Sequence, residues 1–293
     1  MSIIENALDK VRRAPTASAS SAAPTVQAPP PEVPVEPAPR VVHTPQQRIT
    51  IDFNLLRAQG EIPEAGLERR FADYYREIKR PLIQAMLGPE ARPESRLVLV
   101  TSALPGEGKT FTALNLALSV ARERDVSVLL VDADLPKGHL SRTFGLQGVP
   151  GLLDALADET VDIESLVIGT DIKGLEILPA GNAIDGAAEL VASARMGQIA
   201  TRLTARHPRR LVLFDSAPLL ASSEARALKQ VPGKILMVTR AGKTPRHALL
   251  DAIALIDKTK LHGLVLNDAH GGSSDGYYTH YGYSGYGAPE VKR

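Results

Sequence analysis

The chain has 293 residues, of which 44% are hydrophobic, so it is long enough to bury the core of one large α/β domain. Its 34 Lys and Arg residues nearly balance its 33 Asp and Glu residues, which argues against a nucleic acid as a partner. It has no cysteine, and this excludes disulfides, thiolate metal sites and cysteine nucleophiles.

The first segment, residues 1–13, is predicted to be a short amphipathic helix. Five apolar residues lie on one helical stripe: Ile3, Ile4, Ala7, Leu8 and Val11. Such a helix is either a docking element or a frayed helix lying on its own domain. Its charged residues argue against a signal peptide, and no run of the chain approaches the ~20 apolar residues that cross a bilayer. We therefore expect a cytoplasmic protein that reaches a membrane only through a partner.

The next two segments differ sharply in composition. Residues 14–48 consist largely of Pro, Ala, Ser and Val, too few large side chains to offset chain entropy, and predict a disordered, partly polyproline linker. Residues 49–95 predict a helical lead-in to the main domain. Within it, Asp73, Arg76 and either Lys79 or Arg80 recur at three- and four-residue spacing and are expected to share one helix face. Spacing of this kind is also typical of a plain solvated face.

The main domain is predicted at residues 96–270, where strand-like runs alternate with helical patterns. The runs are rich in Val, Leu and Ile with little polar alternation, as in strands covered on both faces. They lie at 96–103, 126–135, 175–181, 211–220, 234–242 and 262–268, with helices at 110–124, 189–207 and 244–260. In the last helix, Thr244 is the expected N-cap and Pro245 the first helical residue. This alternation predicts an α/β fold, with a mostly parallel sheet and helices on both faces.

A phosphate-binding loop of the P-loop NTPase type is predicted between the first strand and first helix of this domain. Small residues there allow backbone N–H groups to converge on phosphate at a helix N-terminus. Lys109 is expected to reach the β- and γ-phosphates of ATP, and Thr110 to hold Mg²⁺. The alternative is a strand-to-helix turn that happens to hold Gly and Lys. The nucleotide-binding residues expected here are Gly106, Glu107, Gly108, Lys109, Thr110 and Phe111.

Three carboxylates follow buried strands: Asp132, Asp134 and Asp215. Because ligands of open α/β sheets gather at the carboxyl ends of the strands, we expect all three to converge on Lys109. Asp132 and Asp134 would form a paired site for a metal or a proton, and Asp215 ends its strand as a Walker B Asp does when it holds Mg²⁺. An Asp in such a place can instead be only a helix cap or a turn residue.

The final segment, residues 271–293, is rich in Gly, Ser and Tyr and is predicted to be a flexible tail. It holds five of the seven tyrosines of the chain: Tyr277, Tyr278, Tyr281, Tyr283 and Tyr286. One interpretation is a low-complexity tail without a function of its own. The other is a set of phosphate acceptors for the nucleotide site upstream.

Several of these motifs together resemble a known family. The loop PGEGKT, the strand VLLVDADL, the run LVLFDSAPLL and the Tyr-rich tail are similar to those of the bacterial protein-tyrosine kinases, the P-loop kinases of exopolysaccharide loci. The opening MSIIENALDKVRR and the run YYREIKRPL look closer to the tyrosine autokinases linked to exosortase. The resemblance covers roughly residues 71–286. Related partition and cell-division ATPases carry an extra Lys in the loop, where this chain has Leu104.

The resemblance implies roles for individual residues. Lys109 and Thr110 would hold ATP and Mg²⁺, and Asp132 would be the base for the incoming tyrosine hydroxyl. Asp134 and Asp215 would organise the metal. Asn267 matches the position that recognises adenine. The trio Asp73, Arg76 and Lys79 matches a Glu-x-x-Arg-x-x-Arg helix through which such kinases form rings, and the tail tyrosines would be phosphorylated in trans.

The resemblance also implies partners and a location. These are further copies of the chain, a transmembrane polysaccharide chain-length regulator that activates the kinase at the inner membrane, and a tyrosine phosphatase. Pro136 stands where the family usually has Arg, and Glu224 where an Asp is expected. Two other functions remain open on the residues alone. One is a partition-type ATPase switch, and the other is a nucleotide-dependent scaffold of a polysaccharide export complex.

Overall fold

The structure is a computed structural model that describes residues 47–269. The predicted N-terminal helix, nearly all of the predicted linker and the tail with its five tyrosines lie outside these residues. Within the described part of the chain, no helix combines the length and the apolar character that a membrane span requires.

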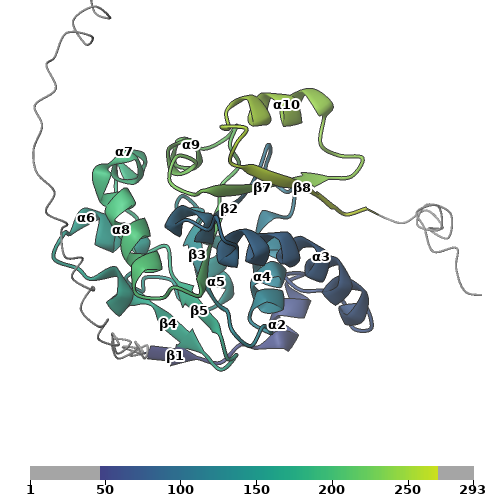
Figure 1. Cartoon of the computed structure of the whole chain (residues 1–293), viewed down its shortest axis with the longest axis horizontal. Coiled ribbons are helices and arrows are strands. Elements are labelled where there is room, and N and C mark those ends of the chain that lie inside the picture. The colour runs from purple at the N-terminus through teal and green to yellow at the C-terminus, as the bar shows by residue number, and fades with distance from the viewer. Residues whose placement is uncertain (1–46, 270–293) are drawn as a thin grey trace, which may run out of the picture. The chain divides into compact units, whose positions relative to one another are not determined.

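Strands from residues 47–269 form a single eight-stranded sheet (Figure 1). Across the sheet they are ordered β1 (Gln47–Ile49), β4 (Ile168–Thr170), β5 (Leu175–Leu178), β3 (Ser127–Ala133), β6 (Arg210–Ser216), β2 (Leu97–Ser102), β7 (Lys234–Arg240) and β8 (Leu261–Asn267). Neighbouring strands are parallel except for the antiparallel pair β4 and β5. The predicted mostly parallel sheet is therefore confirmed.

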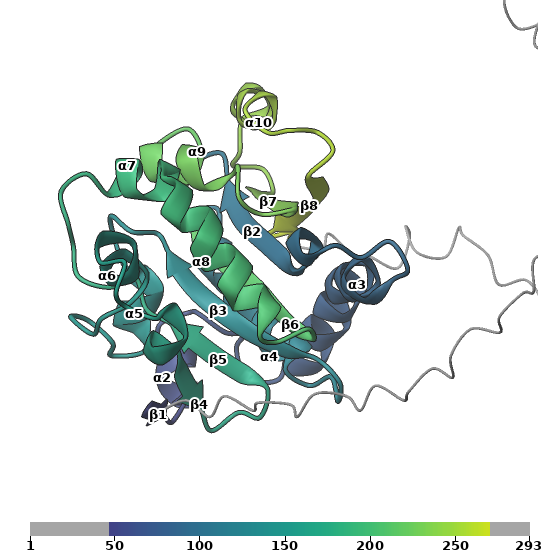
Figure 2. The same ribbon diagram turned by 60° about the vertical axis from the view of Figure 1, so that its left-hand side comes forward.

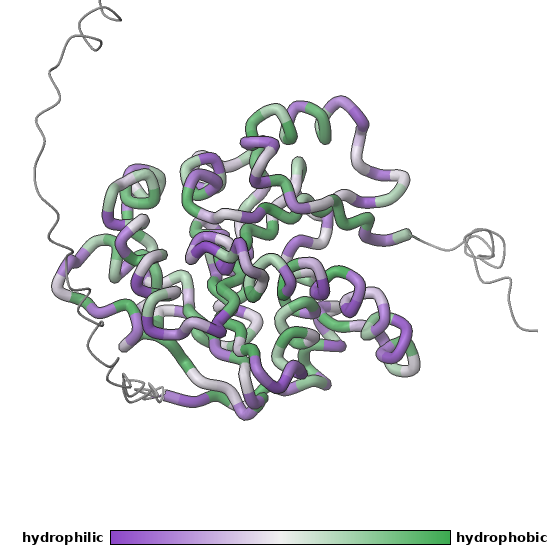
Figure 3. The backbone as a smooth tube through the Cα atoms, viewed as in Figure 1, coloured by the Kyte–Doolittle hydropathy of each residue, from purple (hydrophilic) through white to green (hydrophobic). Residues whose placement is uncertain are grey.

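Helices cover both faces of the sheet, so the middle strands are buried on both sides (Figure 2). One face carries α2 (Phe53–Ala58), α3 (Glu68–Leu87), α4 (Lys109–Val120) and α5 (His139–Thr143). The other carries α6 (Leu152–Ala157), α7 (Ala187–Ala192), α8 (Ala194–Ala205), α9 (Ser223–Leu228) and α10 (Arg246–Ala254). Figure 3 shows the hydrophobic stretches running through the central strands, as expected for strands packed between two helical layers.

Two short strands were not predicted. Strand β1 pairs in parallel with β4, with Gln47 opposite Ile168, and each strand has only three residues. Such short segments carry no hydrophobic period, and their pairing joins parts of the chain about 120 residues apart. Because β1 starts at Gln47, regular structure begins two residues inside the segment expected to be linker.

The helices also depart from prediction. The helix expected at 110–124 ends at Val120, and the one expected at 244–260 ends at Ala254. The helix expected at 189–207 is interrupted at Ser193, whose backbone is extended and separates α7 from α8. The last helix starts one residue late, with Pro245 as N-cap in place of Thr244. The hydroxyl of Thr244 is engaged elsewhere, because it accepts from the backbone N–H of Arg240 at 2.8 Å and donates to Glu107.

Candidate nucleotide-binding site

The predicted phosphate loop lies between β2 and α4. Gly106 and Gly108 have φ values of 78° and 88°, in the left-handed region that side chains other than glycine rarely adopt. Gly108 is the N-cap of α4 and has no side chain to occupy the helix N-terminus. The loop therefore leaves backbone N–H groups at the start of a 12-residue helix, which is the arrangement that binds phosphate.

Glu107, expected among the nucleotide-binding residues, turns its side chain into the protein. Its carboxylate is 3% exposed, accepts from the backbone N–H of Leu104 at 2.8 Å and accepts from the hydroxyl of Thr244. These bonds connect the loop to the segment before α10. Only the backbone of Glu107 is thus left to face a nucleotide. Thr244 was not predicted in this role, because no local pattern marks a partner 137 residues away.

The end of β8 lies against the same loop. The Nδ2 group of Asn267 donates to the carbonyl of Glu107 at 3.0 Å, and Arg240 at the end of β7 donates to the carbonyl of Gly106 at 3.4 Å. Arg240 is held in turn by Asp268, with 2.8 Å between Nε and Oδ2. The predicted adenine-binding residue is therefore beside the phosphate loop, although it lies 158 positions after Lys109 in the sequence.

Of the three carboxylates expected to converge on Lys109, those of Asp134 and Asp215 act on it electrostatically. Lys109 is 8% exposed, and burial lowers the pKa of its ammonium, whereas the charges of Asp215 and Asp134 oppose this change. A buried ammonium near two carboxylates can also bind a phosphate only if a cation or a proton compensates the negative charge of the carboxylates. Mg²⁺ bound together with the phosphate would provide that positive charge.

Asp132 and Asp215 are side by side at the ends of neighbouring strands. They are direct partners in the register of β3 and β6, and both are fully buried. Burial raises the pKa of Asp215 well above its ordinary value, and the nearby charge of Asp132 raises it further, while the hydroxyl of Thr110 and the charge of Lys109 oppose the shift. Among the described residues, no donor meets hydrogen-bond geometry with either carboxylate oxygen of Asp215, although the Thr110 hydroxyl is near enough to affect its pKa. Buried carboxylate oxygens without a hydrogen bond need another partner, and a bound cation is one that would satisfy them.

Asp132 is bound on one side only. Its Oδ2 accepts from the backbone N–H and from the hydroxyl of Ser141, both at 2.7 Å. Burial raises the pKa of Asp132, and the two hydrogen bonds from Ser141 oppose that rise. Its Oδ1 has no partner within residues 47–269. Ser141 was not predicted, because a serine nine residues beyond the acid is not part of any recognisable motif.

The polar groups fit Mg²⁺ together with a nucleotide better than a metal held by protein alone. No group of three His, Asp or Glu side chains in the described part of the chain is placed to hold a metal ion. Mg²⁺ in nucleotide sites takes one or two protein ligands and completes its shell with phosphate and water. The unpartnered oxygens of Asp215, the hydroxyl of Thr110 and the carboxylate of Asp134 suit that kind of site.

The residues expected to form a ring contact on α3 are not all on its outer face. Asp73 and Arg76 form an exposed ion pair at 2.6 Å. Lys79 is 7% exposed, donates to the carbonyl of Ser119 at 2.9 Å and pairs with Glu123 at 2.7 Å. The structure thus separates Lys79 from the other two and uses it to attach α3 to α4.

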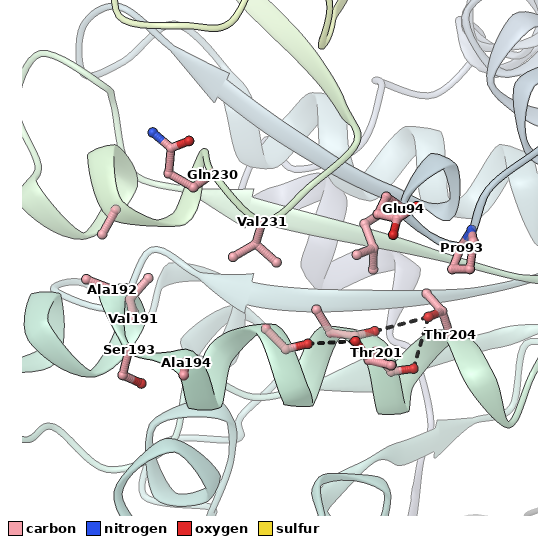
Figure 4. Close-up of a pocket in the computed structure, with 14 residues that line it drawn as sticks. Pro93, Glu94, Val191, Ala192, Ser193, Ala194, Thr201, Thr204, Gln230 and Val231 are labelled. Atoms are coloured by element: carbon pink, nitrogen blue, oxygen red, sulfur yellow. Dashed lines mark hydrogen bonds between the residues drawn. The ribbon is translucent and has the colours of Figure 1, made fainter. Parts of the chain in front are cut away.

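A cavity of about 460 Å³ lies away from the phosphate loop, between α8, α9 and the 3₁₀ helix at Pro93–Arg96 (Figure 4). Its lining is mostly small side chains: Ala192, Ser193, Ala194, Gly197, Ala200, Thr201, Thr204 and Ala227. The hydroxyls of Thr201 and Thr204 donate back to carbonyls of their own helix. None of the predicted site residues lines this cavity, and it offers little to a phosphate.

Comparison with known proteins places these observations in a family, although no protein-family profile matches the chain. The chain is 34% identical over 194 residues to tyrosine-protein kinase YwqD of Bacillus subtilis, covering 66% of this chain and 78% of that protein. It is 30% identical over 191 residues to tyrosine-protein kinase Wzc of Salmonella typhimurium, covering 63% of this chain. Because it spans only 26% of Wzc, it matches part of that longer protein.

Solved structures agree with the sequence relatives. The kinase domain of the Escherichia coli tyrosine kinase ETK is 27% identical, with a TM-score of 0.60 over 72% of this chain and 80% of that domain. The kinase domain of VpsO is 29% identical, with a TM-score of 0.56 over 70% of this chain and 98% of that domain. The resemblance inferred from the motifs is confirmed: with its P-loop fold, the chain belongs to the bacterial tyrosine-protein kinases.

Proposed function

We propose that this protein transfers the γ-phosphoryl group of ATP to tyrosine hydroxyls in the C-terminal tail of a second copy of itself. The observation that carries the proposal is the placement of buried Lys109 near Asp134 and Asp215, at the start of a helix that follows a glycine loop. Membership of the tyrosine-kinase family supports the choice of acceptor.

The reaction follows from these groups. The tyrosine oxygen forms a bond to the γ-phosphorus, the bond from that phosphorus to the bridging oxygen breaks, and ADP leaves with the electron pair. In this proposal, Lys109 and the loop N–H groups bind the phosphates, and Asn267 orients the adenine. Thr110, Asp134 and Asp215 would hold Mg²⁺, which would supply positive charge to neutralise the phosphates. The phenolic proton passes to the carboxylate of Asp132.

A tyrosine hydroxyl can transfer its proton only if it reaches Asp132. Asp132 is fully buried, and a Cβ added to Gly138 would lie 3.9 Å from Oδ2 of Asp132, an ordinary contact distance. Gly138 belongs to a turn held by two backbone bonds to the carbonyl of Asp134, from Lys137 and from Gly138 itself. In this proposal, residues around the buried Asp132 have to move before a tyrosine can deliver its proton.

The acceptors we propose are the five tail tyrosines. Of the two tyrosines within the described residues, Tyr75 is buried and Tyr74 lies on α3. The tail follows β8, and about 15 flexible residues span roughly 20 Å, enough to reach the site of a neighbouring copy. Each phosphotyrosine adds about −1.5 to −2 charges, so a fully modified tail would repel its neighbours and loosen an assembly.

In the same proposal, copies assemble through the outer face of α3, where Asp73 and Arg76 are exposed. A transmembrane chain-length regulator recruits and activates the kinase at the inner membrane, and a tyrosine phosphatase removes the phosphates. The cycle of assembly then regulates exopolysaccharide export. Comparing the oligomer masses of phosphorylated and phosphatase-treated protein tests this part, and equal masses contradict it.

The central experiment is incubation with labelled ATP and Mg²⁺, followed by phosphotyrosine mapping. Label is expected on tail tyrosines of the wild type and on none in Lys109→Met. A variant with all five tail tyrosines changed to Phe is expected to bind ATP normally and to carry no label. Steady phosphate release without labelled tyrosine would instead indicate an ATPase switch, and binding without turnover would indicate a scaffold.

A further inference from the structure

The short helix α5 brings a second polar group to Asp132. Ser141, in the middle of this helix, is 5% exposed and makes two hydrogen bonds to the same oxygen. Its backbone N–H and its hydroxyl each lie 2.7 Å from Oδ2 of Asp132. Two short bonds from one residue to one carboxylate oxygen fix both the position and the rotation of that carboxylate.

The direction of the Ser141 hydroxyl is also fixed. Its oxygen accepts a hydrogen bond from the backbone N–H of Ala180 at 3.0 Å. Since that bond occupies a lone pair, the hydroxyl proton is left to point at Asp132. Residues from β3, from α5 and from the end of β5 are therefore joined through one side chain.

The helix that carries Ser141 is itself held in place. Its first residue, His139, lies 2.6 Å from Oε1 of Glu61 through Nε2. Glu61 belongs to the segment between α2 and α3, and its backbone carbonyl accepts from Asn115 of α4 at 2.9 Å. Ser141 is thus part of a rigid frame, even though α5 has only five residues.

We propose that Ser141 is the positioning residue of Asp132 in phosphoryl transfer, an inference that rests on the kinase function proposed above. By binding Oδ2 twice, Ser141 leaves Oδ1 as the one oxygen of Asp132 without a protein partner in the described chain. That oxygen is then the one that receives the phenolic proton. Ser141 touches neither nucleotide nor tyrosine and acts only through the orientation of the acid.

The first test compares the full-length wild type with Ser141→Ala under saturating Mg²⁺ and ATP. A misoriented reacting group typically costs up to about a hundredfold, so kcat is expected to fall roughly ten- to a hundredfold. KM for ATP and the affinity for a fluorescent ATP analogue are expected to stay within about twofold, because the phosphate loop is untouched. Equal turnover in the two proteins would overturn the inference. Parallel loss of nucleotide affinity and thermal stability would overturn it too, since it would show a structural role.

Two further variants show whether a loss of activity in Ser141→Ala is caused by misfolding of α5. Thr143→Val removes a hydroxyl from the same helix that donates to the carbonyl of His139 at 3.0 Å, and it is expected to keep wild-type turnover. Ser141→Thr retains the hydroxyl and is expected to recover most of the activity. A folded Ser141→Thr protein that is as slow as Ser141→Ala would contradict the proposal.

A double-mutant comparison separates positioning from every other effect. In an Asp132→Asn background the acid is already lost, so adding Ser141→Ala is expected to change turnover by less than about twofold. Independent, multiplying losses would overturn the inference. Phosphate release from ATP is measured alongside tyrosine labelling. Absence of labelled tyrosine in the wild type contradicts the proposed function, whereas equal rates with and without the Ser141 hydroxyl contradict this inference.

Discussion

The side-chain amide of Asn267 lies directly on Gly108. A Cβ added to Gly108 would be 1.9 Å from Nδ2 of Asn267, and the same Nδ2 donates to the carbonyl of Glu107 at 3.0 Å. The last strand of the sheet therefore occupies the space that any other residue at position 108 would need. The nucleotide loop and the predicted adenine-binding residue form one unit.

Gly108→Ala is expected to reduce nucleotide affinity at least tenfold. The new Cβ must displace Asn267, and the backbone φ of 88° adds strain on the order of 1–3 kcal/mol. Titration with a fluorescent ATP analogue measures the effect. Gly145→Ala is the matched control, because Gly145 has a φ of 68° and nothing within 4 Å of an added Cβ. It is expected to lose stability but to keep its nucleotide affinity, and equal affinities of the two variants would refute the role of the Asn267 contact.

Asp215→Asn is expected to stabilise the nucleotide-free protein while abolishing Mg²⁺-dependent labelling. Burial raises the pKa of Asp215 well above its ordinary value. The protonated Asp215 carboxyl of the wild type therefore contributes fully to stability at pH values below the pKa of an unfolded Asp, about 3.9. This contribution is lost as the pH rises through the raised pKa of the folded state. The Tm advantage of the variant should grow between about pH 4 and pH 8.

Asp158→Asn provides the opposite case. Asp158 accepts from the hydroxyl and from the backbone N–H of Thr160, at 2.7 and 2.8 Å, and these bonds lower its pKa. Loss of this carboxylate is expected to cause a small loss of stability at pH values above 4.

The result that would contradict the Asp215 prediction is an Asp215→Asn protein with a lower Tm than the wild type at pH 8. It would show that the buried acid is satisfied by a group other than a bound cation.

The buried ion pair of Arg210 and Glu164 predicts acid sensitivity. Nη1 of Arg210 lies 2.8 and 3.0 Å from the two oxygens of Glu164, and both residues are at most 1% exposed. Burial alone would raise the pKa of Glu164, but His207 and Arg210 outweigh it, so the pKa is lowered. The contribution is present above the unfolded pKa of about 4.3 and is lost as the pH falls through the folded pKa.

Glu164→Gln is therefore expected to cost about 3–5 kcal/mol of stability at pH 7, and the difference should shrink toward pH 3. Denaturant unfolding at several pH values measures it. Asp125→Asn breaks the exposed pair with Arg209, at 3.4 Å, and is expected to change stability by less than about 1 kcal/mol. A Glu164→Gln deficit that does not depend on pH would be inconsistent with a carboxylate held ionised by Arg210.

Lys79 and Arg76 are expected to behave differently when they are removed. Lys79→Ala loses a buried bond to Ser119 and should lower the free energy of unfolding by about 1–3 kcal/mol. Arg76→Ala loses only an exposed ion pair with Asp73 and should leave stability within about 0.5 kcal/mol. Light scattering of the same proteins then tests assembly, where Arg76→Ala is expected to have the larger effect. If Lys79→Ala assembled less well but kept its stability, Lys79 would have to be assigned to the contact between copies.

Much of the fold could be predicted because its central strands are short apolar runs separated by clear helices. The six predicted strands are all present, and the charges of Asp134 and Asp215 act on Lys109. Two of the missed features depend on contacts between distant parts of the chain. These are the pairing of β1 with β4 and the inward turn of Lys79, and a three-residue spacing does not tell a buried lysine from an exposed one. The hydrogen bonds from Ser141 to Asp132 span only nine residues, but no sequence pattern marks them.

Helix α3 is fastened to α4 at two points along its length. Lys79 binds the carbonyl of Ser119, and the ring of Phe71 meets the ring of Phe111 edge-on, with 5.7 Å between centroids. Because α4 begins with Lys109, these two contacts join α3 directly to the helix that starts at the proposed phosphate site. A change in the position of α3 therefore has a short structural route to that end of α4.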